Sequence, residues 1–426
     1  MSEFDTAFQM AASNVRFGPG ITAEVGEDLL SLGARRTLVV IDPRLRALPT
    51  GQTVLTALDA ADIPHQVFDG ISVEPTDASF HAAIRAAEAF GCDSFVAVGG
   101  GSTIDTAKAA NLYTTYPADF FDYVNAPIGR GLPVPGPMKP LIAIPTTAGT
   151  GSETTGVAIF DYVQMRAKTG IANRHLKPTL GLVDPDNTRT QPAHVAASTG
   201  LDVLSHALES YTALPYYRRI RPAHSTLRPA YQGSNPISDV WALKALELVD
   251  QHLLQAFENP ANEEARFAML IASAIAGIGF GNAGVHLPHG MSYPVAGMVR
   301  DYTHPGYDPD HPLVPHGISV ILHTAAVVRF TAPADPHRHL QAAKALGADT
   351  TGADPADAGE ILAARVLEFC RRLGVPNGLE AVGYGLGDVP ALVQGTLPQH
   401  RVTKLSPIPA DEVVLDRLFR ESMRLW

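Results

Sequence analysis

The feature that most constrains the fold of this chain is a change of pattern near its middle. In the first half, short apolar runs alternate with helical patterns, and the runs at residues 36–42, 65–69, 94–101 and 141–145 are predicted strands. Helices are predicted at residues 53–61 and 77–90, and from a cap at Ser102 or Thr103 through residue 110. Strand–helix alternation of this kind predicts a parallel sheet with helices on its faces.

The second half shows long helical patterns and no clear strands. Apolar residues three and four apart predict helices at residues 194–212, 237–257, 263–277, 316–330 and 356–373. The stretch 216–235 reads as an ordered insertion, and residues 378–426 read as short helices. The predicted fold class is therefore an α/β nucleotide-binding domain over residues 1–190, followed by an all-helical domain over residues 191–426.

Composition excludes several other classes of protein. Hydrophobic residues make up 46% of the chain, which argues against disorder, and the net charge of −11 argues against nucleic acid or an anionic membrane as a partner. The apolar stretch 268–280 is too short to span a membrane. Two cysteines exclude a disulfide framework, and the N-terminus has neither a secretory nor a transit pattern. These observations predict a cytoplasmic protein.

Two loops rich in small and hydroxyl side chains each follow a predicted strand. Glycine lets a backbone approach a phosphate closely, and the N-terminus of a following helix offers free N–H groups. Each loop alone is also compatible with a tight turn or a capped helix, but two such loops favour one nucleotide at the carboxyl ends of a sheet. The residues concerned are Gly99, Gly100, Gly101, Ser102 and Asp105 in the first loop, and Thr146, Thr147, Thr150 and Ser152 in the second.

Asp42 ends the first of the predicted strands. A carboxylate there accepts hydrogen bonds from adenosine ribose hydroxyls and repels a 2′-phosphate, which favours NAD over NADP. The alternative is that Asp42 caps a helix or a turn, and both interpretations stay open.

Four residues in the second half have the chemistry of a metal site. Asp202 and His206 are four residues apart in a helical pattern and so share one helix face. His289 and His316 come from two further segments, and five of the sixteen histidines fall between His286 and His316. One carboxylate and three imidazoles suit a divalent first-row ion, although any one of these histidines alone would more often be structural.

Five segments together resemble one enzyme family. They are GGGSTIDTAK (99–108), PTTAGTGSE (145–153), TGLDVLSHALESYT (199–212), HGMSYP (289–294) and PHGISV (315–320). Their order resembles the iron-containing, or group III, alcohol dehydrogenases over nearly the whole chain. Further segments, including RPAYQGSNPISD and GTLPQHRVTKL, resemble the hydroxyacid–oxoacid transhydrogenase branch of that family.

The resemblance implies a dehydroquinate synthase-like architecture and an oxidoreductase that binds NAD. It implies Asp202, His206, His289 and His316 as metal ligands, with Fe²⁺ expected and Zn²⁺ as the alternative, and Lys168 near the nicotinamide ribose. The metal would act as a Lewis acid while hydride passes through NAD from 4-hydroxybutyrate or 3-hydroxybutyrate to 2-oxoglutarate. A homo-oligomer, a dimer or larger, is also implied.

One position departs from the family pattern. Many members have a histidine four residues after the third ligand, where this chain has Tyr293, so Tyr293 or His286 is the candidate for proton relay. Carboxylate substrates need a cationic patch, for which Arg218, Arg219 and His304 are candidates. The segment 304–312 lengthens the chain relative to simple alcohol dehydrogenases and is expected to shape the substrate pocket.

Three other functions stay open at this point. A plain alcohol dehydrogenase would release free NADH, and a lyase of the dehydroquinate synthase kind would catalyse no net redox exchange. A binding protein without enzymatic activity would keep the loops but would not need the metal ligands.

Overall fold

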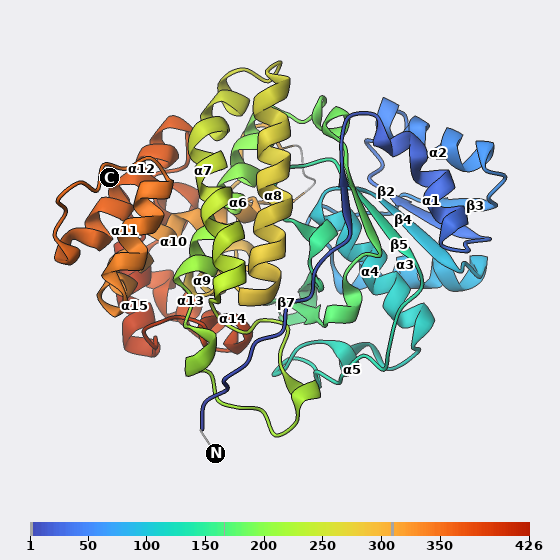
Figure 1. The fold of residues 1–426 in the computed structure, drawn as a ribbon. Helices are drawn as coiled ribbons and strands as arrows, with labels where there is room; N and C mark the ends of the chain where they lie inside the picture. Colours follow the sequence, from blue (N-terminus) through green and yellow to red (C-terminus); the bar gives the residue numbers. More distant parts are fainter. Residues whose placement is uncertain (1–2, 166, 308–310) are drawn as a thin grey trace. The chain divides into compact units, whose positions relative to one another are not determined.

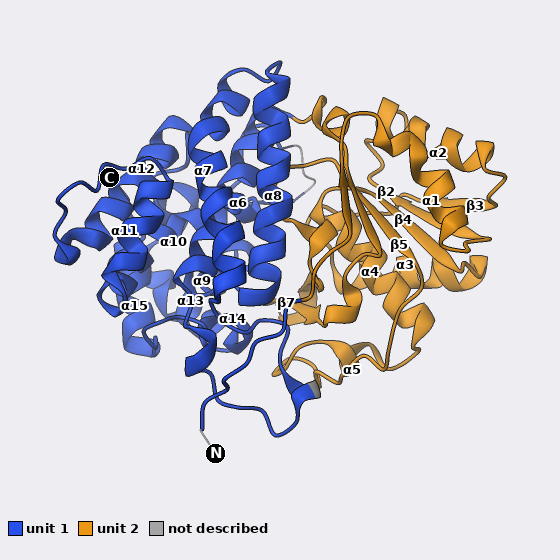
Figure 2. Ribbon diagram, in the orientation of Figure 1, with its two compact units in different colours: residues 1–10, 192–426 blue, residues 11–191 orange. Residues whose placement is uncertain are grey.

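The chain divides into two compact units (Figure 2). The computed structural model describes residues 3–165, 167–307 and 311–426. One unit is Ala11–Gln191, and the other combines Met1–Met10 with Pro192–Trp426. A parallel sheet with helices in the first unit and a helical second unit confirm the predicted fold class.

A six-stranded parallel sheet in the order β1-β8-β5-β4-β2-β3 forms the centre of the first unit (Figure 1). Its strands are β1 (Val15–Phe17), β2 (Thr37–Ile41), β3 (His65–Phe68), β4 (Ser94–Gly99), β5 (Leu141–Pro145) and β8 (Leu180–Val183). An antiparallel pair, β6 (Val157–Tyr162) and β7 (Ala167–Ala172), stands apart from the sheet. The four predicted strands are present, whereas β1, β6, β7 and β8 were not predicted. β1 has only three residues, and Gly181 interrupts the short apolar run of β8.

Alternating side chains bury both faces of this sheet. In β2, Val39 and Ile41 pack with α1 (Val25–Ser31) and α2 (Pro49–Ala60), while Leu38 and Val40 pack against the opposite helices. Those opposite helices are α3 (Asp77–Phe90) and α4 (Gly101–Thr115); the short α5 (Phe120–Tyr123) follows them. Burial on both faces explains why these strands read as continuous apolar runs.

The two predicted loops start from the same edge of the sheet. Gly99 at the end of β4 lies opposite Pro145 at the end of β5, and Ile41 of β2 lies opposite Val98. The chain leaves β2 toward β3 on one side and β4 toward β5 on the other, so the strand order reverses between β2 and β4. Ligands of open α/β sheets bind at the carboxyl ends of strands at such a reversal.

The second unit contains no named strand among its described residues. Its helices are α6 (Ala193–Thr212), α7 (Pro236–Glu258), α8 (Glu263–Ala283), α9 (Leu287–Gly297), α10 (His316–Thr331), α11 (Pro336–Ala345), α12 (Ala358–Arg372), α13 (Val389–Thr396), α14 (His400–Thr403) and α15 (Glu412–Glu421). Helix α6 packs against α7, α8 and α10, and α9 packs against α10, α13 and α14. Helix α9 was not predicted, because prolines at its start and inside it interrupt the pattern.

The first residues of the chain belong with the helical unit, which differs from the predicted division at residue 190. Asp5 accepts hydrogen bonds from Arg219 at 2.5 Å and from Arg228 at 2.9 Å. Gln9 and Gln232 exchange two further hydrogen bonds of 2.9 and 2.8 Å. These polar contacts join positions more than 200 residues apart, so no local sequence pattern predicts them.

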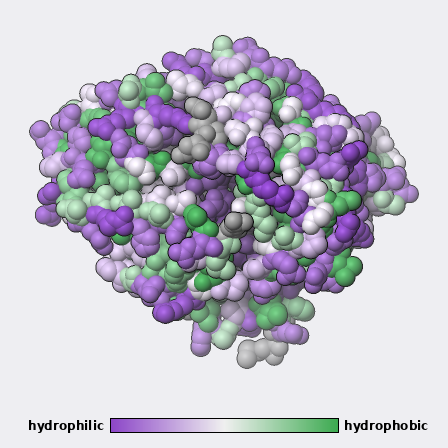
Figure 3. All heavy atoms as spheres, turned by 180° about the vertical axis from the view of Figure 1, so that it is seen from behind, coloured by the Kyte–Doolittle hydropathy of each residue, from purple (hydrophilic) through white to green (hydrophobic). Residues whose placement is uncertain are grey.

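Two helices contain longer apolar segments than the sequence pattern indicated. By length and composition alone, Glu263–Ala283 and His316–Ala334 could each cross a membrane. However, 72% and 78% of their apolar windows are buried inside the structure, as in core helices of a globular unit. On the face drawn in Figure 3, hydrophobic residues lie in small groups among hydrophilic ones. The apolar side chains of both helices therefore serve mainly to build the core.

Candidate metal centre and nucleotide-binding loops

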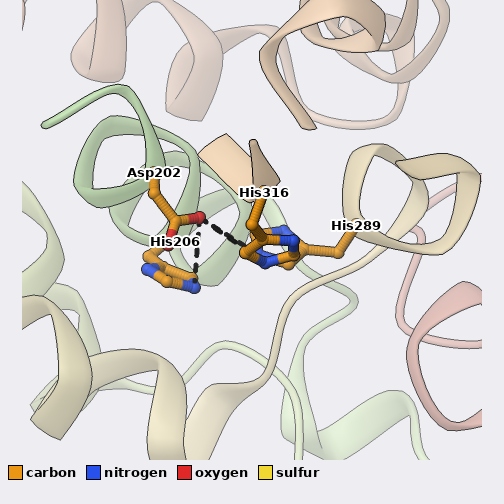
Figure 4. Close-up of side chains that lie close together, drawn as sticks. All are labelled: Asp202, His206, His289 and His316. Atoms are coloured by element: carbon orange, nitrogen blue, oxygen red, sulfur yellow. Dashed lines mark ion pairs between the residues drawn. The ribbon is translucent and has the colours of Figure 1, made fainter. Parts of the chain in front are cut away.

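Asp202, His206, His289 and His316 come together inside the helical unit (Figure 4). One ligand atom from each residue lies within 4.8 Å of all the others. The Nε2 atoms of the three histidines lie 3.6, 3.7 and 3.8 Å from Asp202 Oδ1. Around a tetrahedral ion with bonds of about 2.1 Å, ligand atoms stand about 3.4 Å apart, so the spacing suits a divalent cation.

Burial of the cluster leaves ligand atoms without partners. Asp202, His206 and His289 are at most 4% exposed, whereas the His316 side chain is 26% exposed. Asp202 Oδ1 and His289 Nε2 are shielded from solvent and have no hydrogen-bond partner within the described part of the chain. Because buried polar atoms are nearly always hydrogen-bonded, these two atoms fit a site that a cation completes.

A glycine lets the helices that carry the ligands approach one another. Helix α6 supplies Asp202 and His206, one turn apart. At the start of α10, a Cβ atom on Gly317 would lie 1.9 Å from the carbonyl oxygen of Ser198 on α6. Only glycine allows this close approach, which brings the neighbouring His316 to the cluster.

Glu209 supports the cluster and was missed by the sequence reasoning. Its Oε1 pairs with His289 Nδ1 at 2.5 Å, and its Oε2 accepts a hydrogen bond from the backbone N–H of His286 at 2.7 Å. Carboxylates in this position fix the orientation of a metal-binding imidazole and raise its basicity. The available signal was the spacing of positions 202, 206 and 209, which share one face of α6.

The charges around the cluster favour a cation between two carboxylates. Burial lowers the pKa of His206 to about 3, which keeps its imidazole in the neutral form that binds metals. Burial also disfavours a charge on His289, but Glu209 and Asp202 outweigh it and raise the His289 pKa to about 10. Burial alone would raise the pKa of Asp202, yet the surrounding imidazoles hold it well below its usual range.

The two candidates for proton relay have different surroundings. Tyr293 follows His289 by one helical turn, and its hydroxyl accepts a hydrogen bond from Arg401 Nη2 at 3.0 Å. His286 is 1% exposed, and its Nε2 pairs with Thr212 Oγ1 at 3.0 Å. Burial lowers the pKa of His286 to about 4. His286 therefore lies in the network around Glu209, outside the group of ligand atoms.

The cationic residues proposed for carboxylate substrates are already paired, neutral or exposed. Arg219 forms an ion pair with Asp5 at 2.5 Å. His304 Nδ1 pairs with the hydroxyl of Tyr302 at 2.7 Å, and burial lowers the His304 pKa to about 4, so its ring is neutral near pH 7. Arg218 lies exposed in a short 3-10 helix. Within the segment 304–312, residues 308–310 lie outside the described part of the chain.

In the α/β unit, the two predicted loops contact each other. A Cβ atom on Gly100 would lie 3.1 Å from Thr147 Oγ1, and one on Gly101 would lie 2.6 Å from Thr150 Cγ2. The backbone N–H of Thr146 donates to the carbonyl oxygen of Gly99 at 3.1 Å. The glycines therefore allow one continuous surface of backbone and hydroxyl groups at the sheet edge.

Helix α4 begins two or three residues earlier than a cap at Ser102 or Thr103 predicts. Its cap is Gly100, which provides no side-chain hydrogen bond, so neither Ser102 nor Thr103 is the capping residue. The predicted cap was wrong because glycine in an extended conformation serves at that position without a side-chain oxygen. The first N–H groups of the helix are consequently without a side-chain cap, as in helices that bind phosphate.

Asp105 and Ser152 connect the two loops through buried hydrogen bonds. Ser152 Oγ donates to Asp105 Oδ1 at 2.5 Å and accepts from Lys108 Nζ at 2.6 Å. Lys108 is fully buried and also donates to the carbonyl oxygen of Val157 at 2.8 Å. These buried contacts hold the two loops together.

Asp42 and Lys168 differ in how much of their charge is already paired. Asp42 follows β2, is partly exposed, and accepts a hydrogen bond from the backbone N–H of Arg44 at 2.9 Å. Lys168 is 1% exposed and forms ion pairs with Glu74 and, at 3.2 Å, with Asp161. Two carboxylates therefore already compensate the charge of Lys168.

Comparison with known proteins establishes the family. Residues 12–185 match the family described as iron-containing alcohol dehydrogenase, and residues 230–423 match the C-terminal domain of the same family. The chain belongs to the iron-containing alcohol dehydrogenases. This confirms the resemblance seen in the sequence and identifies the protein as an enzyme of this oxidoreductase family.

Relatives within the family match nearly the whole chain. Hydroxyacid-oxoacid transhydrogenase, mitochondrial, of Bos taurus is 57% identical over 424 residues, which cover 99% of this chain and 91% of that protein. The protein of the same name from Homo sapiens is 56% identical with the same coverage. A probable hydroxyacid-oxoacid transhydrogenase of Dictyostelium discoideum is 50% identical over 437 residues, covering 99% and 80%.

Solved structures share the fold. A 1,3-propanediol oxidoreductase superposes with a TM-score of 0.85 at 27% identity, covering 98% of this chain and 100% of that chain. The sulfoacetaldehyde reductase of Bifidobacterium kashiwanohense, solved with NAD⁺, gives a TM-score of 0.79 at 26% identity, covering 98% and 99%. Both likenesses extend over the two units of the chain.

The predicted cytoplasmic location is contradicted by these relatives. The transhydrogenases of Bos taurus, Pongo abelii and Homo sapiens are all named mitochondrial. The prediction rested on the composition of the first residues and on cysteine usage, and neither observation distinguishes the cytoplasm from a mitochondrial compartment.

Proposed function

We propose that this enzyme is a hydroxyacid–oxoacid transhydrogenase. It takes hydride from 4-hydroxybutyrate or 3-hydroxybutyrate and delivers it, through NAD, to 2-oxoglutarate. The observation that carries the proposal is the buried cluster of one carboxylate and three imidazoles, in a chain 56–57% identical to enzymes of that name. A protein that only bound nucleotides would have no use for the unpaired ligand atoms.

Asp202, His206, His289 and His316 would hold a divalent metal, Fe²⁺ by family and Zn²⁺ as the alternative. When bound, such an ion supplies Lewis-acid polarisation of the substrate oxygen. Glu209 keeps the His289 ring oriented. Because the Tyr293 hydroxyl accepts its hydrogen bond from Arg401, its own proton stays available for a second partner. This arrangement supports Tyr293 as the group that exchanges a proton with the substrate hydroxyl.

The loops at the sheet edge would hold NAD. The uncapped N-terminus of α4 and the glycines before it suit a pyrophosphate, and the hydroxyls of the second loop suit ribose and amide groups. Asp42, which follows β2, would accept hydrogen bonds from the adenosine ribose and would repel a 2′-phosphate. These residues therefore support NAD as the cofactor.

The proposal is tested by following the hydride. The metal-loaded protein is incubated anaerobically with 4-hydroxybutyrate deuterated at the carbinol carbon, together with 2-oxoglutarate. Deuterium at C2 of 2-hydroxyglutarate, without exchange into added NAD, is the expected result. Steady accumulation of free NADH would instead identify a plain alcohol dehydrogenase, and a product without any redox change would identify a lyase.

A pair of histidine variants links the exchange to the cluster. His289→Ala removes one ligand and should abolish deuterium transfer. His337→Ala removes an exposed histidine of α11 and should leave it unchanged. Transfer that survives in His289→Ala would refute the role of the cluster.

A further inference from the structure

Arg401 on α14 occupies an unusual environment for an arginine. Its guanidinium lies over the ring of Tyr231, 4.9 Å from the ring centroid, and Nη2 donates to the Tyr293 hydroxyl at 3.0 Å. The Nη1 atom is shielded from solvent and has no hydrogen-bond partner among the residues that the structure describes. Arg401 therefore retains an unused, desolvated donor between two tyrosines.

The charge of Arg401 has no carboxylate to balance it. Among the described residues, no Asp or Glu forms an ion pair with this guanidinium, whereas Arg338 and Arg365, which are also partly buried, pair with Asp239 and Asp250 at 2.6 and 2.5 Å. A shielded cation without a counter-charge is costly in free energy unless a ligand supplies one. Guanidinium groups bind carboxylates in a two-pronged geometry that Lys does not reproduce.

Arg401 also lies next to residues that build the metal cluster. Helix α14 packs on α9 at Gly290, where a Cβ atom would lie 2.7 Å from Thr403 Cγ2. Tyr293, which holds Arg401, and His289 of the cluster are one turn apart on α9, about 6 Å along the helix axis. On the other side, Tyr231 contacts Phe280 with ring centroids 6.4 Å apart. Phe280 in turn stacks on the cluster residue His206, with centroids 3.9 Å apart.

We propose that Arg401 binds the carboxylate of the substrate that lies remote from the reacting carbon. This inference rests on the proposed function. It replaces the candidates drawn from the sequence, because Arg219 is already paired with Asp5 and His304 is neutral.

Substrate chemistry explains how one arginine can serve both half-reactions. In 4-hydroxybutyrate, two methylene groups separate the carbinol carbon from the carboxylate carbon. In 2-oxoglutarate, two methylene groups also separate the ketone carbon from the distal carboxylate carbon. A cation at one fixed distance from the reacting centre therefore positions the donor and the acceptor alike. In 3-hydroxybutyrate one methylene group is missing, so the enzyme should favour the 4-hydroxy isomer.

The test compares acidic and neutral substrates in Arg401→Gln. Loss of a charge-assisted hydrogen bond predicts an increase of about 10- to 100-fold in KM for both 4-hydroxybutyrate and 2-oxoglutarate. For deuterium exchange between 1-butanol and pentanal, which carry no carboxylate, the lost hydrogen bond to Tyr293 should lower kcat, but the KM values should change less than about threefold. Arg401→Lys keeps the charge but loses the planar fork, so its KM values should fall between those of the parent and of Arg401→Gln.

Lys404→Gln is the matched control. Lys404 is exposed just after α14, three residues from Arg401, and the substitution removes the same charge from the chain. The control should leave all KM values unchanged. An equal rise of the KM values for acidic and neutral substrates in Arg401→Gln, or unchanged KM values for the acids, would overturn the assignment.

Binding of 2-oxoglutarate, measured by calorimetry on the metal-loaded protein with NAD, separates this inference from the proposed function. Binding that weakens about 10-fold or more in Arg401→Gln supports the role of Arg401 even if no hydride exchange is found, in which case the proposed function alone fails. If exchange proceeds but 2-oxoglutarate binds both proteins equally, the role of Arg401 is refuted and the proposed function stands.

Discussion

Replacing Glu209 by Gln should weaken metal binding, although the size and shape of the side chain change very little. The parent carboxylate accepts hydrogen bonds on both sides, from His289 Nδ1 at 2.5 Å and from the backbone N–H of His286 at 2.7 Å. An amide has only one oxygen, so in either orientation its NH₂ group faces one of these donors. Glu209 is 1% exposed, and water cannot compensate for the lost contact.

The expected magnitude follows from that geometry. Removing the carboxylate partner of a metal-binding imidazole typically costs 10- to 100-fold in metal affinity, about 1.4 to 2.8 kcal/mol. The assay is a titration of metal-free Glu209→Gln with Co²⁺ against a competing chelator, beside the parent protein. Glu247→Gln is the control, on α7, where the Glu247 side chain is 46% exposed. Equal Co²⁺ affinity of parent and Glu209→Gln would refute the argument that Glu209 supports the centre.

Three further predictions follow from close contacts and ion pairs. Gly317→Ala should push α10 away from α6 at Asp202, lowering stability by about 1 to 3 kcal/mol in thermal unfolding and lowering metal affinity in the same titration. Gly101→Ala should raise the Kd for NAD about 10-fold or more in a fluorescence titration, whereas Gly387→Ala, with open space around it, should not. The arginines beside Asp5 hold its pKa below the usual value, so their contribution to stability is present at neutral pH and is lost as the pH falls below about 4. Pepsin should therefore cleave the first ten residues faster below that pH, and Asp5→Asn should expose the same segment to proteases at pH 7.

The elements that the sequence predicted well are those whose signal is local. Residues 77–90 form a helix with the predicted bounds, because the apolar spacing is regular and Thr76 caps the first turn. The helix predicted at residues 263–277 extends to Ala283, since glycines near its end weaken the pattern but are buried in the core. Short strands such as β1 depend on pairing with a distant strand and have too few residues to show a period.

The site shows the same distinction between local and long-range information. Asp202 and His206 are adjacent on one helix face, so their spacing in the sequence is enough to indicate a shared role. Arg219 has the sequence context of a free cation, and it is the fold that brings Asp5 from the other end of the chain to neutralise it. Arg401 belongs to a segment that resembles the transhydrogenase branch, yet its missing counter-charge is a property of its neighbours in space, which the sequence does not reveal.

The convergence of ligands from α6, α9 and α10 has a consequence for how the protein persists in a cell. An ion shared by positions 202 and 316 would tie off a stretch of roughly 110 residues, as a reversible cross-link does. Ligand binding that is specific to the folded state adds to stability in proportion to the logarithm of free ligand concentration. Scarcity of the metal would then lower the amount of this protein through unfolding and proteolysis, and would also leave the remaining molecules inactive. The abundance of the protein would therefore depend on the supply of the ion.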